Sequence, residues 1–283
     1  MVYSAASDQA AYERAVEHYQ VIFRTDGEML LLNLDLEGQV AYAIPGEAGD
    51  MLVHSSTQHP SEVQHMVAHA LGVPNHAVTV EIRRMGGGFG GKETQSSVFA
   101  IAAALLARAT RRPVKLRVDR DDDIVGSGKR HDFLYDYDAG CDADGRLAAL
   151  RLSMASRCGL SADLSGAVND RAIFHADNAY YLPHVGIESH RCKTHTVSST
   201  AFRGFGGPQG MFAAEGVIAA IARRLGLDAL DVRKRNLYGP APRNVTHYGM
   251  TLQDNVLPQL IDELEETSSY RERREAVRAF NAS

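Results

Sequence analysis

The sequence predicts an α+β fold, in which helices and strands of mixed order build the core. Three observations lead to this prediction. Helical and strand-like periodicities alternate along the 283 residues without the repeating strand–helix–strand rhythm of a parallel sheet. Two strand patterns within residues 133–156 are joined by an Asp-Gly turn, which favours a hairpin. The apolar share of 45% and the charged share of 23% are typical of a globular chain with ample length for a buried core.

The first half of the chain alternates between helix and strand patterns. Apolar residues recur at helical spacing in SEVQHMVAHALGVP (residues 61–74), and Gly72 then ends the helix. A half-buried strand is indicated by VTVEIRR (78–84), in which apolar and polar residues alternate. Residues 94–109 are small and apolar nearly all round, which predicts a helix buried on most sides. An alternating strand follows in PVKLRVD (113–119).

The second half is expected to hold a hairpin followed by helices. The hairpin turns at Asp142–Gly145, where the glycine supplies the positive φ that such a turn needs. A proline is tolerated in the first turn of a helix, and glycine favours its end. The expected helices run from Pro208 to Arg224 with Gly226 as the end, from the cap Asp228 to about Asn236, and near residues 255–267 and 270–281.

Composition disfavours several classes of partner. A net charge of −5 gives no reason to expect nucleic acid. No apolar run reaches the length of a membrane span, and the polar N-terminus lacks the apolar segment of a signal peptide. Cys141, Cys158 and Cys192 have no CxxC spacing and are expected to be reduced thiols. These features indicate a soluble, cytoplasmic chain without a nucleic-acid or membrane partner.

Two glycine-rich loops share the four residues Gly-Phe-Gly-Gly. They are GGGFGGKE at 86–93 and RGFGGPQG at 203–210, and each is followed by a helical pattern. Glycines allow the backbone to approach a ligand closely, and a helix N-terminus presents unpaired N–H groups to negative charge. The pair predicts one large, multiply anionic ligand or two nearby ones. Tight turns that only pack helices on a sheet stay open as the alternative.

Two nucleotide-binding motifs nearly fit the first loop. The GxGxxG spacing follows a strand and precedes a helix, but that strand carries polar residues on one face, whereas a central parallel strand is apolar on both. Asp119 also lies further along than the ~20 residues typical of a dinucleotide site. A phosphate-binding P-loop fits as far as Lys92, but Glu93 stands where a hydroxyl should hold Mg²⁺. Both motifs are therefore disfavoured.

Charged residues near the loops allow more than one interpretation. Glu93 precedes a helix, so it could serve the helix dipole or a ligand. Arg203 could reach the anion of the second loop, and Arg171 could either contact a ligand or pair with Asp170. The acidic run at 119–123 lacks EF-hand spacing and is expected to be a solvated turn. The twelve histidines show no zinc spacing, so no metal ligated by protein side chains is expected.

Four segments, in this order and spacing, closely resemble the molybdenum-cofactor-binding part of the xanthine dehydrogenases, within the molybdenum hydroxylase superfamily. They are VHSSTQHPSEVQ (53–64), RRMGGGFGGKET (83–94), RAIFHADNAYYLP (171–183) and KTHTVSSTAFRGFGGPQG (193–210). The resemblance implies the mixed sheets and helices of the molybdopterin-binding domain of the xanthine dehydrogenase and aldehyde oxidase type, in incomplete form. It covers residues 36–283 as a partial cofactor-binding domain, and residues 1–35 match weakly.

The resemblance also implies roles for particular residues. Gln58 corresponds to a glutamine that hydrogen-bonds an oxygen ligand of the metal, and Phe89 and Gly90 to a loop against the metal ligands. Arg203 corresponds to the second part of the cofactor cradle, and Phe205 to an aromatic that stacks on a planar substrate. Glu93 and Arg171 correspond to a catalytic pair that grips a purine on its two edges, where an arginine can stabilise negative charge on a ring oxygen.

The implied function is that of part of a catalytic subunit that converts hypoxanthine or xanthine to urate, in purine catabolism. Molybdenum would be held by molybdopterin, with Fe–S clusters and FAD in other chains or domains and electrons passing to NAD. The implied partners are the remainder of the molybdenum subunit and an Fe–S/FAD subunit, in a hetero-oligomer, together with the purine.

The resemblance leaves alternatives open. The family's general-base glutamate lies further toward the C-terminus than this sequence extends, so the chain alone is expected not to hydroxylate xanthine. A truncated non-catalytic remnant, or a binding module of a split subunit, is the first alternative, and its signature would be the lack of molybdenum. A Rossmann-type nucleotide-binding protein is a more distant one.

Overall fold

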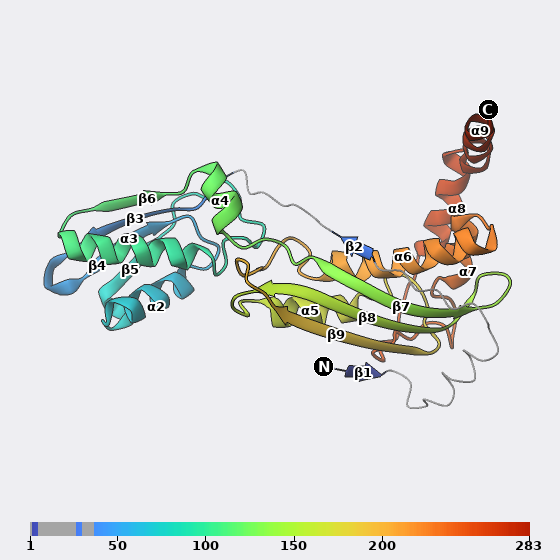
Figure 1. The fold of residues 1–283 in the computed structure, drawn as a ribbon, viewed down its shortest axis with the longest axis horizontal. Helices are drawn as coiled ribbons and strands as arrows, with labels where there is room; N and C mark the ends of the chain where they lie inside the picture. The colour runs from blue at the N-terminus through green and yellow to red at the C-terminus, as the bar shows by residue number, and fades with distance from the viewer. Residues whose placement is uncertain (1, 5–26, 30–36) are drawn as a thin grey trace.

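The computed structural model describes residues 2–4, 27–29 and 37–283, and this part of the chain forms two lobes (Figure 1). Each lobe has its own sheet and its own apolar core. Each sheet combines parallel with antiparallel pairing. The predicted α+β class with mixed sheets is therefore confirmed. The expected boundary between residues 35 and 36 lies outside the described residues and stays a prediction.

The smaller lobe is a four-stranded sheet, in the order β5-β4-β3-β6, with two helices on one face (Figure 1). β4 and β5 pair in parallel, and the other neighbours are antiparallel. Alternate strand residues such as Ala41 and Val53 meet Val63, Val67 and Ala100 of the helices in the core. The elements are β3 (Val40–Pro45), η1 (Glu47–Gly49), β4 (Met51–Ser55), α2 (Pro60–Leu71), η2 (Asn75–Ala77), β5 (Val78–Glu81), α3 (Ser96–Thr110) and β6 (Val114–Arg117).

The larger lobe is a five-stranded sheet, in the order β1-β9-β8-β7-β2, packed against two helices. β8 and β9 pair in parallel, and the rest are antiparallel. The short helix α4 (Arg120–Gly126) lies between the lobes (Figure 1). The larger lobe's elements are β1 (Val2–Ser4), β2 (Gly27–Met29), β7 (Phe133–Cys141), β8 (Leu147–Gly159), α5 (Ser165–Phe174), β9 (Val185–Lys193), α6 (Gly207–Leu225) and α7 (Ala229–Asn236).

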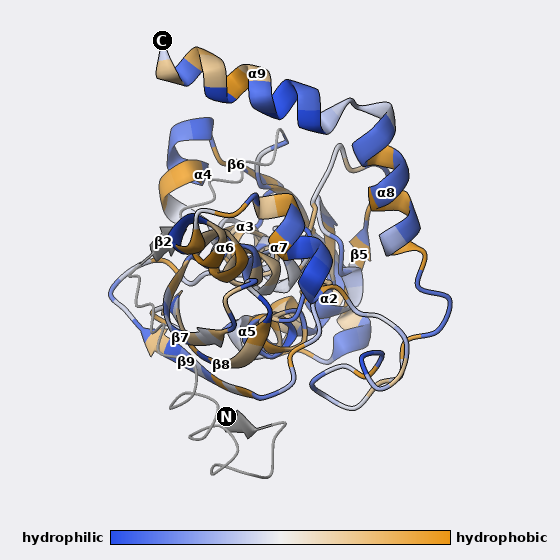
Figure 2. Cartoon of the chain, turned by 90° about the vertical axis from the view of Figure 1, so that its right-hand side faces the viewer, coloured by the Kyte–Doolittle hydropathy of each residue, from blue (hydrophilic) through white to orange (hydrophobic). Residues whose placement is uncertain are grey.

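Two further helices carry the chain away from the larger lobe (Figure 1). They are α8 (Leu257–Thr267) and α9 (Tyr270–Ala282), and neither contains a buried residue. Figure 2 shows α9 as a projecting helix in which polar residues alternate with apolar ones. Apolar contact with the core is made at α8, through the half-buried Leu257 and Ile261.

The predicted hairpin and helix ends are confirmed. β7 and β8 are joined by a turn in which Asp142 Oδ1 accepts hydrogen bonds from the N–H groups of Asp144 and Arg146. Gly145 adopts the positive φ of 82° that the turn requires. The expected caps hold as well, since Gly226 ends α6 in the left-handed region and Asp228 accepts a hydrogen bond from Leu230 N at 2.9 Å.

Two sequence-based expectations were wrong. The helix expected over residues 94–109 is α3, and its outer face is open in the described structure, with Val98 61% and Leu106 50% exposed. Its buried face consists mainly of alanines, Ala100, Ala103, Ala104 and Ala107, so the even apolarity of the sequence overstated its burial. The acidic run at 119–123 is no solvated turn: it begins helix α4, with Asp119 as the cap and Asp123 buried.

Two further features are absent from the described residues. No helix there has the length and apolar composition that crossing a bilayer requires. No group of three or more His, Cys, Asp or Glu side chains in the same part of the chain is arranged to hold a metal ion.

Candidate functional site

The two glycine loops lie against each other at the junction of the lobes. Gly90 of the first loop has a φ of 100°, and a Cβ there would stand 2.9 Å from the carbonyl carbon of Ala201 and 3.0 Å from Phe202 Cα. Such distances leave no room for a side chain. The sequence motif suggested that glycine allows close approach to a ligand, and the structure shows that the close approach at Gly90 is to residues 201–202, directly before the second loop.

A buried ion pair fixes the inner side of the first loop. Lys92 is fully buried, with Nζ 3.0 Å from Glu37 Oε1 and 3.0 Å from Ser56 Oγ. The Glu37 carboxylate also accepts hydrogen bonds from Ser56 Oγ and from the Gly86 N–H. Burial, the largest single effect, raises the pKa of Glu37, but the hydrogen bonds from Ser56, Lys92 and Gly86 together outweigh it and hold the pKa below its usual value. The Lys92 ammonium is thus paired with Glu37 and does not face a phosphate site, which is a second reason to reject the P-loop.

Gln58 is held by the first loop with its amide group oriented. Its Oε1 accepts hydrogen bonds from the N–H of Gly90 at 2.7 Å and of Lys92 at 3.4 Å. Its own N–H donates to the Lys92 carbonyl at 2.9 Å. The side chain is exposed, and its Nε2 has no partner among the described residues. The Gln58 amide therefore has an available hydrogen-bond donor beside the first loop.

Phe89 stands at the tip of the first loop. Its φ is 43°, in the left-handed region that non-glycine residues rarely adopt, and its side chain is 55% exposed. Its backbone N–H donates to no acceptor among the described residues. An exposed aromatic with a strained backbone and a free donor is typical of a binding loop.

The second loop is shaped by three consecutive residues with positive φ: Gly204, Phe205 and Gly206. A Cβ at Gly206 would stand 2.1 Å from the carbonyl oxygen of Val168, so glycine is needed for the loop to lie on α5. The Phe205 N–H donates to the Phe202 carbonyl at 2.7 Å. This contact leaves the Phe205 ring half-buried beside α5.

Arg171 projects from α5 over the ring of Phe205, with Cζ 6.0 Å from the ring centroid. The alternative partner Asp170 pairs instead with Arg191 of β9. Within the described structure Arg171 makes no ion pair, and its side chain is exposed. The interpretation as an Asp170 ion pair is therefore wrong, and Arg171 is left with an aromatic contact and an available guanidinium.

Glu93 and Arg203 flank the loops with their charged groups unpaired in the described part of the chain. The Glu93 N–H donates to the Gly90 carbonyl at 3.3 Å, and its half-buried carboxylate accepts no hydrogen bond from the described N–H groups of α3. Arg203 is exposed, and its carbonyl accepts a hydrogen bond from Arg130 Nη2 at 2.6 Å. Among the described residues, the Glu93 side chain therefore makes no hydrogen bond to the first turn of α3, and the helix-dipole interpretation stays a prediction.

Three residues at the junction escaped the sequence analysis. Asp163, in the β8–α5 connection, accepts hydrogen bonds from side chains beside both loops. Arg130 stacks over Phe202 at 5.2 Å from the ring centroid. His131 is buried, its Nε2 2.7 Å from Ser165 Oγ at the start of α5, and burial lowers its pKa to about 4. An isolated Asp, Arg or His in a connecting segment gives no sequence signal of such a position.

The residues at the junction fit an anionic, planar group. The available donors are the Gln58 amide and the Phe89 N–H, and Arg203 and Arg171 supply positive charge. Phe89 and Phe205 supply aromatic surface. Such a set can hold an anionic cofactor by hydrogen bonds and stack a flat substrate beside it.

A family model described as "Molybdopterin cofactor-binding domain" matches residues 11–237 of the chain. Xanthine dehydrogenase from Drosophila subobscura is 40% identical over 271 residues, which cover 96% of this chain and 20% of the relative. Xanthine dehydrogenase/oxidase from Mus musculus is 43% identical over 247 residues, covering 87% of this chain and 18% of the relative. The chain thus spans about a fifth of the length of these curated relatives.

A solved structure shares the fold. Aldehyde oxidoreductase from Desulfovibrio gigas superposes with a TM-score of 0.81 at 26% identity, over 94% of this chain and 29% of that one. The four resembling segments and the fold therefore agree on one family.

Proposed function

This chain belongs to the molybdopterin cofactor-binding domain family of the molybdenum hydroxylases, and we propose that it forms part of the catalytic subunit of a purine hydroxylase. The proposed substrates are hypoxanthine and xanthine, and the product is urate. The relatives named xanthine dehydrogenase support this proposal. The proposed partners are the remaining molybdenum-binding segment and an Fe–S/FAD unit, with NAD as the final electron acceptor.

One observation carries the purine assignment. Arg171 stands over the Phe205 ring with its guanidinium unpaired in the described structure, because its neighbour Asp170 is taken by Arg191. A planar substrate stacked on Phe205 would bring a polar ring edge within reach of that guanidinium. Glu93, on the other lobe, is the proposed partner for the opposite edge. An aldehyde has no second polar edge to be gripped in this way.

Each side chain has a defined task in this proposal. The bound molybdopterin with its metal supplies the two-electron redox chemistry. The Gln58 amide would donate a hydrogen bond to the bound group, and the Phe89 N–H and Arg203 would hold its anionic part; the Gly90 N–H orients the Gln58 amide by donating to its Oε1. Phe205 stacks on the purine, Glu93 orients a ring nitrogen, and Arg171 stabilises negative charge that grows on the ring oxygen during the reaction.

The first test is metal and cofactor analysis of the purified enzyme that contains this chain. Near-stoichiometric molybdenum and pterin, with turnover of xanthine, supports the proposal. The competing proposal is a non-catalytic binding module. It is tested as well because the chain matches only 20% of the length of its relative from Drosophila subobscura. That module would contain no molybdenum and would show no turnover.

The second test addresses specificity through Arg171→Met. A contact made mainly in the transition state lowers kcat when it is lost, and one such electrostatic contact is worth about 2.7–4 kcal/mol. We therefore expect kcat/KM for xanthine to fall by roughly 10²-fold, with a far smaller change for benzaldehyde. Arg224→Met is the matched control, since Arg224 is an exposed arginine in the last turn of α6 in the same lobe and leaves the Asp170–Arg191 pair intact. Equal losses for both substrates in Arg171→Met would contradict the assignment.

A further inference from the structure

Asp163 connects three segments that carry the proposed site. Its carboxylate accepts hydrogen bonds from Thr94 Oγ1 at 2.9 and 3.0 Å, from Gln95 Nε2 at 2.6 Å and from Thr200 Oγ1 at 3.2 Å. Thr94 directly follows Glu93, and Thr200 lies three residues before Arg203. Asp163 itself lies just before α5, the helix that carries Arg171. The Asp163 carboxylate thus contacts residues close in sequence to Glu93 and Arg203, and Asp163 itself precedes the helix that carries Arg171.

These hydrogen bonds cross the junction between the lobes. Thr94 and Gln95 precede α3 of the smaller lobe, whereas Asp163 and Thr200 belong to the larger one. Gln95 extends the connection, since its Oε1 accepts a hydrogen bond from the Gly128 N–H at 2.9 Å. The separation of Glu93 from Arg171 is therefore set by how the lobes meet, and Asp163 is a polar anchor at that meeting point.

The local chemistry suits a fixed anchor. Asp163 has a φ of 42°, in the left-handed region that Asp and Asn tolerate better than most residues. Its partners are neutral donors, and no Lys or Arg of the described residues forms an ion pair with it. An ionised carboxylate only accepts, so each hydroxyl and amide that meets it must point its hydrogen inward. That requirement fixes the rotamers of Thr94, Gln95 and Thr200.

We propose that Asp163 is a positioning residue that sets the spacing between Glu93 and Arg171, and with it the enzyme's preference for purines. The proposal rests on the proposed function for those two residues. It also makes a claim independent of catalysis, namely that Asp163 orders the segments on both sides of the junction. Displacement by about 1 Å of a residue that grips a substrate can cost on the order of 10²-fold in rate.

The test is Asp163→Asn in the enzyme that contains this chain. Asn keeps the left-handed backbone but replaces one acceptor oxygen with a donor, and it also removes the negative charge that acts on His131. We expect kcat/KM to fall at least roughly 10-fold for xanthine and less than about 2-fold for benzaldehyde. Combined with Glu93→Gln, Asp163→Asn should add less than about 2-fold, because residues acting through one contact are not additive. Equal losses for both substrates, or full additivity, would show a purely structural role.

Amide hydrogen exchange gives a readout that does not depend on turnover. Residues 94–97 and 200–203 should exchange faster in Asp163→Asn than in the unmodified enzyme. Asp142→Asn is the matched control, because Asp142 also accepts hydrogen bonds in a turn but stays within the larger lobe. Unchanged exchange at both segments overturns the proposal even if the enzyme turns over xanthine.

The proposed function and the role of Asp163 are tested by different measurements. An enzyme without molybdenum or purine turnover removes the proposed function, whereas the exchange measurement still decides whether Asp163 orders the junction. If Asp163→Asn does not accumulate in folded form, Thr94→Val and Thr200→Val each remove one donor and keep side-chain volume similar. Each should then speed exchange on the opposite side of the junction, and the lack of such an effect in both would overturn the proposal.

Discussion

Lys92 and Glu37 show how a single buried charge can fix a loop. Lys92 is fully buried, and its countercharge comes from a residue 34% exposed at the side chain. Removing one partner of a buried pair costs about 3–5 kcal/mol, and the partial exposure of Glu37 places Glu37→Gln near the lower end, about 3 kcal/mol. Lys92→Met combined with Glu37→Gln should recover most of that loss. Urea unfolding of the unmodified protein, the two single variants and the double variant measures it, and a double variant as unstable as Glu37→Gln would refute the pairing.

His131 predicts a pH dependence of stability. Burial lowers its pKa from 6.5 to about 4, despite the favourable charges of Asp163 and Asp132. Because the unfolded chain takes up the proton first, the contribution of His131 is complete above pH 6.5 and is lost as the pH falls toward 4. The loss over this window is about 3 kcal/mol. His131→Gln should be less stable at pH 7.5 but lose less on acidification, and identical pH slopes in the two proteins would contradict this.

Individual residues were predictable only where a motif named them. The seven proposed site residues came from resemblance, and the structure brings their segments to one junction. Asp163 gave no signal, because its role depends on two lobes meeting around it. Lys92 gave a misleading one: beside glycines it looks like a phosphate ligand, and its burial depends on Glu37, which is distant in sequence. Long-range partners decide such cases, and local patterns do not contain them.

At the scale of elements, close backbone contact between Gly90 and residues 201–202 fixes the conformation of the glycine loops. Gly90→Ala should force the loops apart, since a Cβ would meet Ala201 at 2.9 Å and the φ of 100° disfavours any side chain. We expect a loss of about 2 kcal/mol or more in stability, with loss of bound cofactor. Gly166→Ala on α5 is the control, because no atom lies within 4 Å of its Cβ position. Thermal unfolding and molybdenum content together test this, and normal values for both in Gly90→Ala would contradict it.

Local elements were largely predictable because their signals are local. The hairpin turn at Gly145 and the helix ends at Gly72 and Gly226 follow from the φ that glycine allows. The parallel pairing of β8 with β9 is different, since it joins strands separated by α5. Likewise, the sequence of α3 shows apolar residues on every side but not which side meets the sheet. Pairing partners and exposed faces depend on tertiary contacts, which periodicity does not encode.

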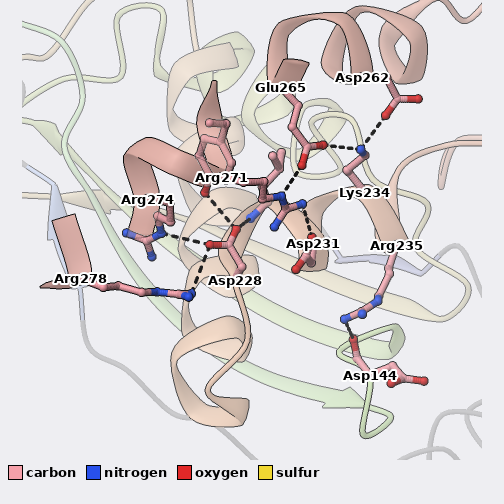
Figure 3. Close-up of polar contacts among 12 residues, drawn as sticks. Asp144, Asp228, Asp231, Lys234, Arg235, Asp262, Glu265, Arg271, Arg274 and Arg278 are labelled. Atoms are coloured by element: carbon pink, nitrogen blue, oxygen red, sulfur yellow. Dashed lines mark hydrogen bonds and ion pairs between the residues drawn. The ribbon is translucent and has the colours of Figure 1, made fainter. Parts of the chain in front are cut away.

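At the scale of the whole molecule, two lobes meet where the glycine loops touch, while α8 and α9 extend from the opposite end of the larger lobe (Figure 1). The described contacts of α9 with the lobe are mainly polar. Figure 3 shows Arg271, Arg274 and Arg278 of α9 directed toward Asp228 and Asp231 at α7 and Glu265 of α8. Lys234 of α7 pairs in the same way with Asp262 and Glu265 of α8. Ion pairs, with little apolar burial, therefore hold α9 against α7 and α8.

Asp228 is the most buried acceptor of this charge cluster, so it should control the docking of α9. It accepts hydrogen bonds from Arg274 Nε at 3.0 Å and Tyr270 Oη at 2.9 Å. Burial, the largest single effect, raises the pKa of its carboxyl, but Arg274, the Leu230 N–H and Tyr270 outweigh it and lower the pKa below the usual 3.8. A lowered carboxyl pKa means that the contribution is present above pH 3.8 and is lost as the pH falls below it.

Docking of α9 should therefore weaken in Asp228→Asn and at high ionic strength, since salt screens exposed ion pairs. Asn still caps α7, so this variant removes charge without removing the cap. Hydrogen exchange should speed up in residues 270–282, with little change in β7 and β8. Glu275→Gln is the matched control, because the ion pair of Glu275 within the described residues is with Arg278 of its own helix. If exchange in α9 is unchanged both in Asp228→Asn and in about 1 M salt, apolar contacts and not ion pairs hold the helix in position.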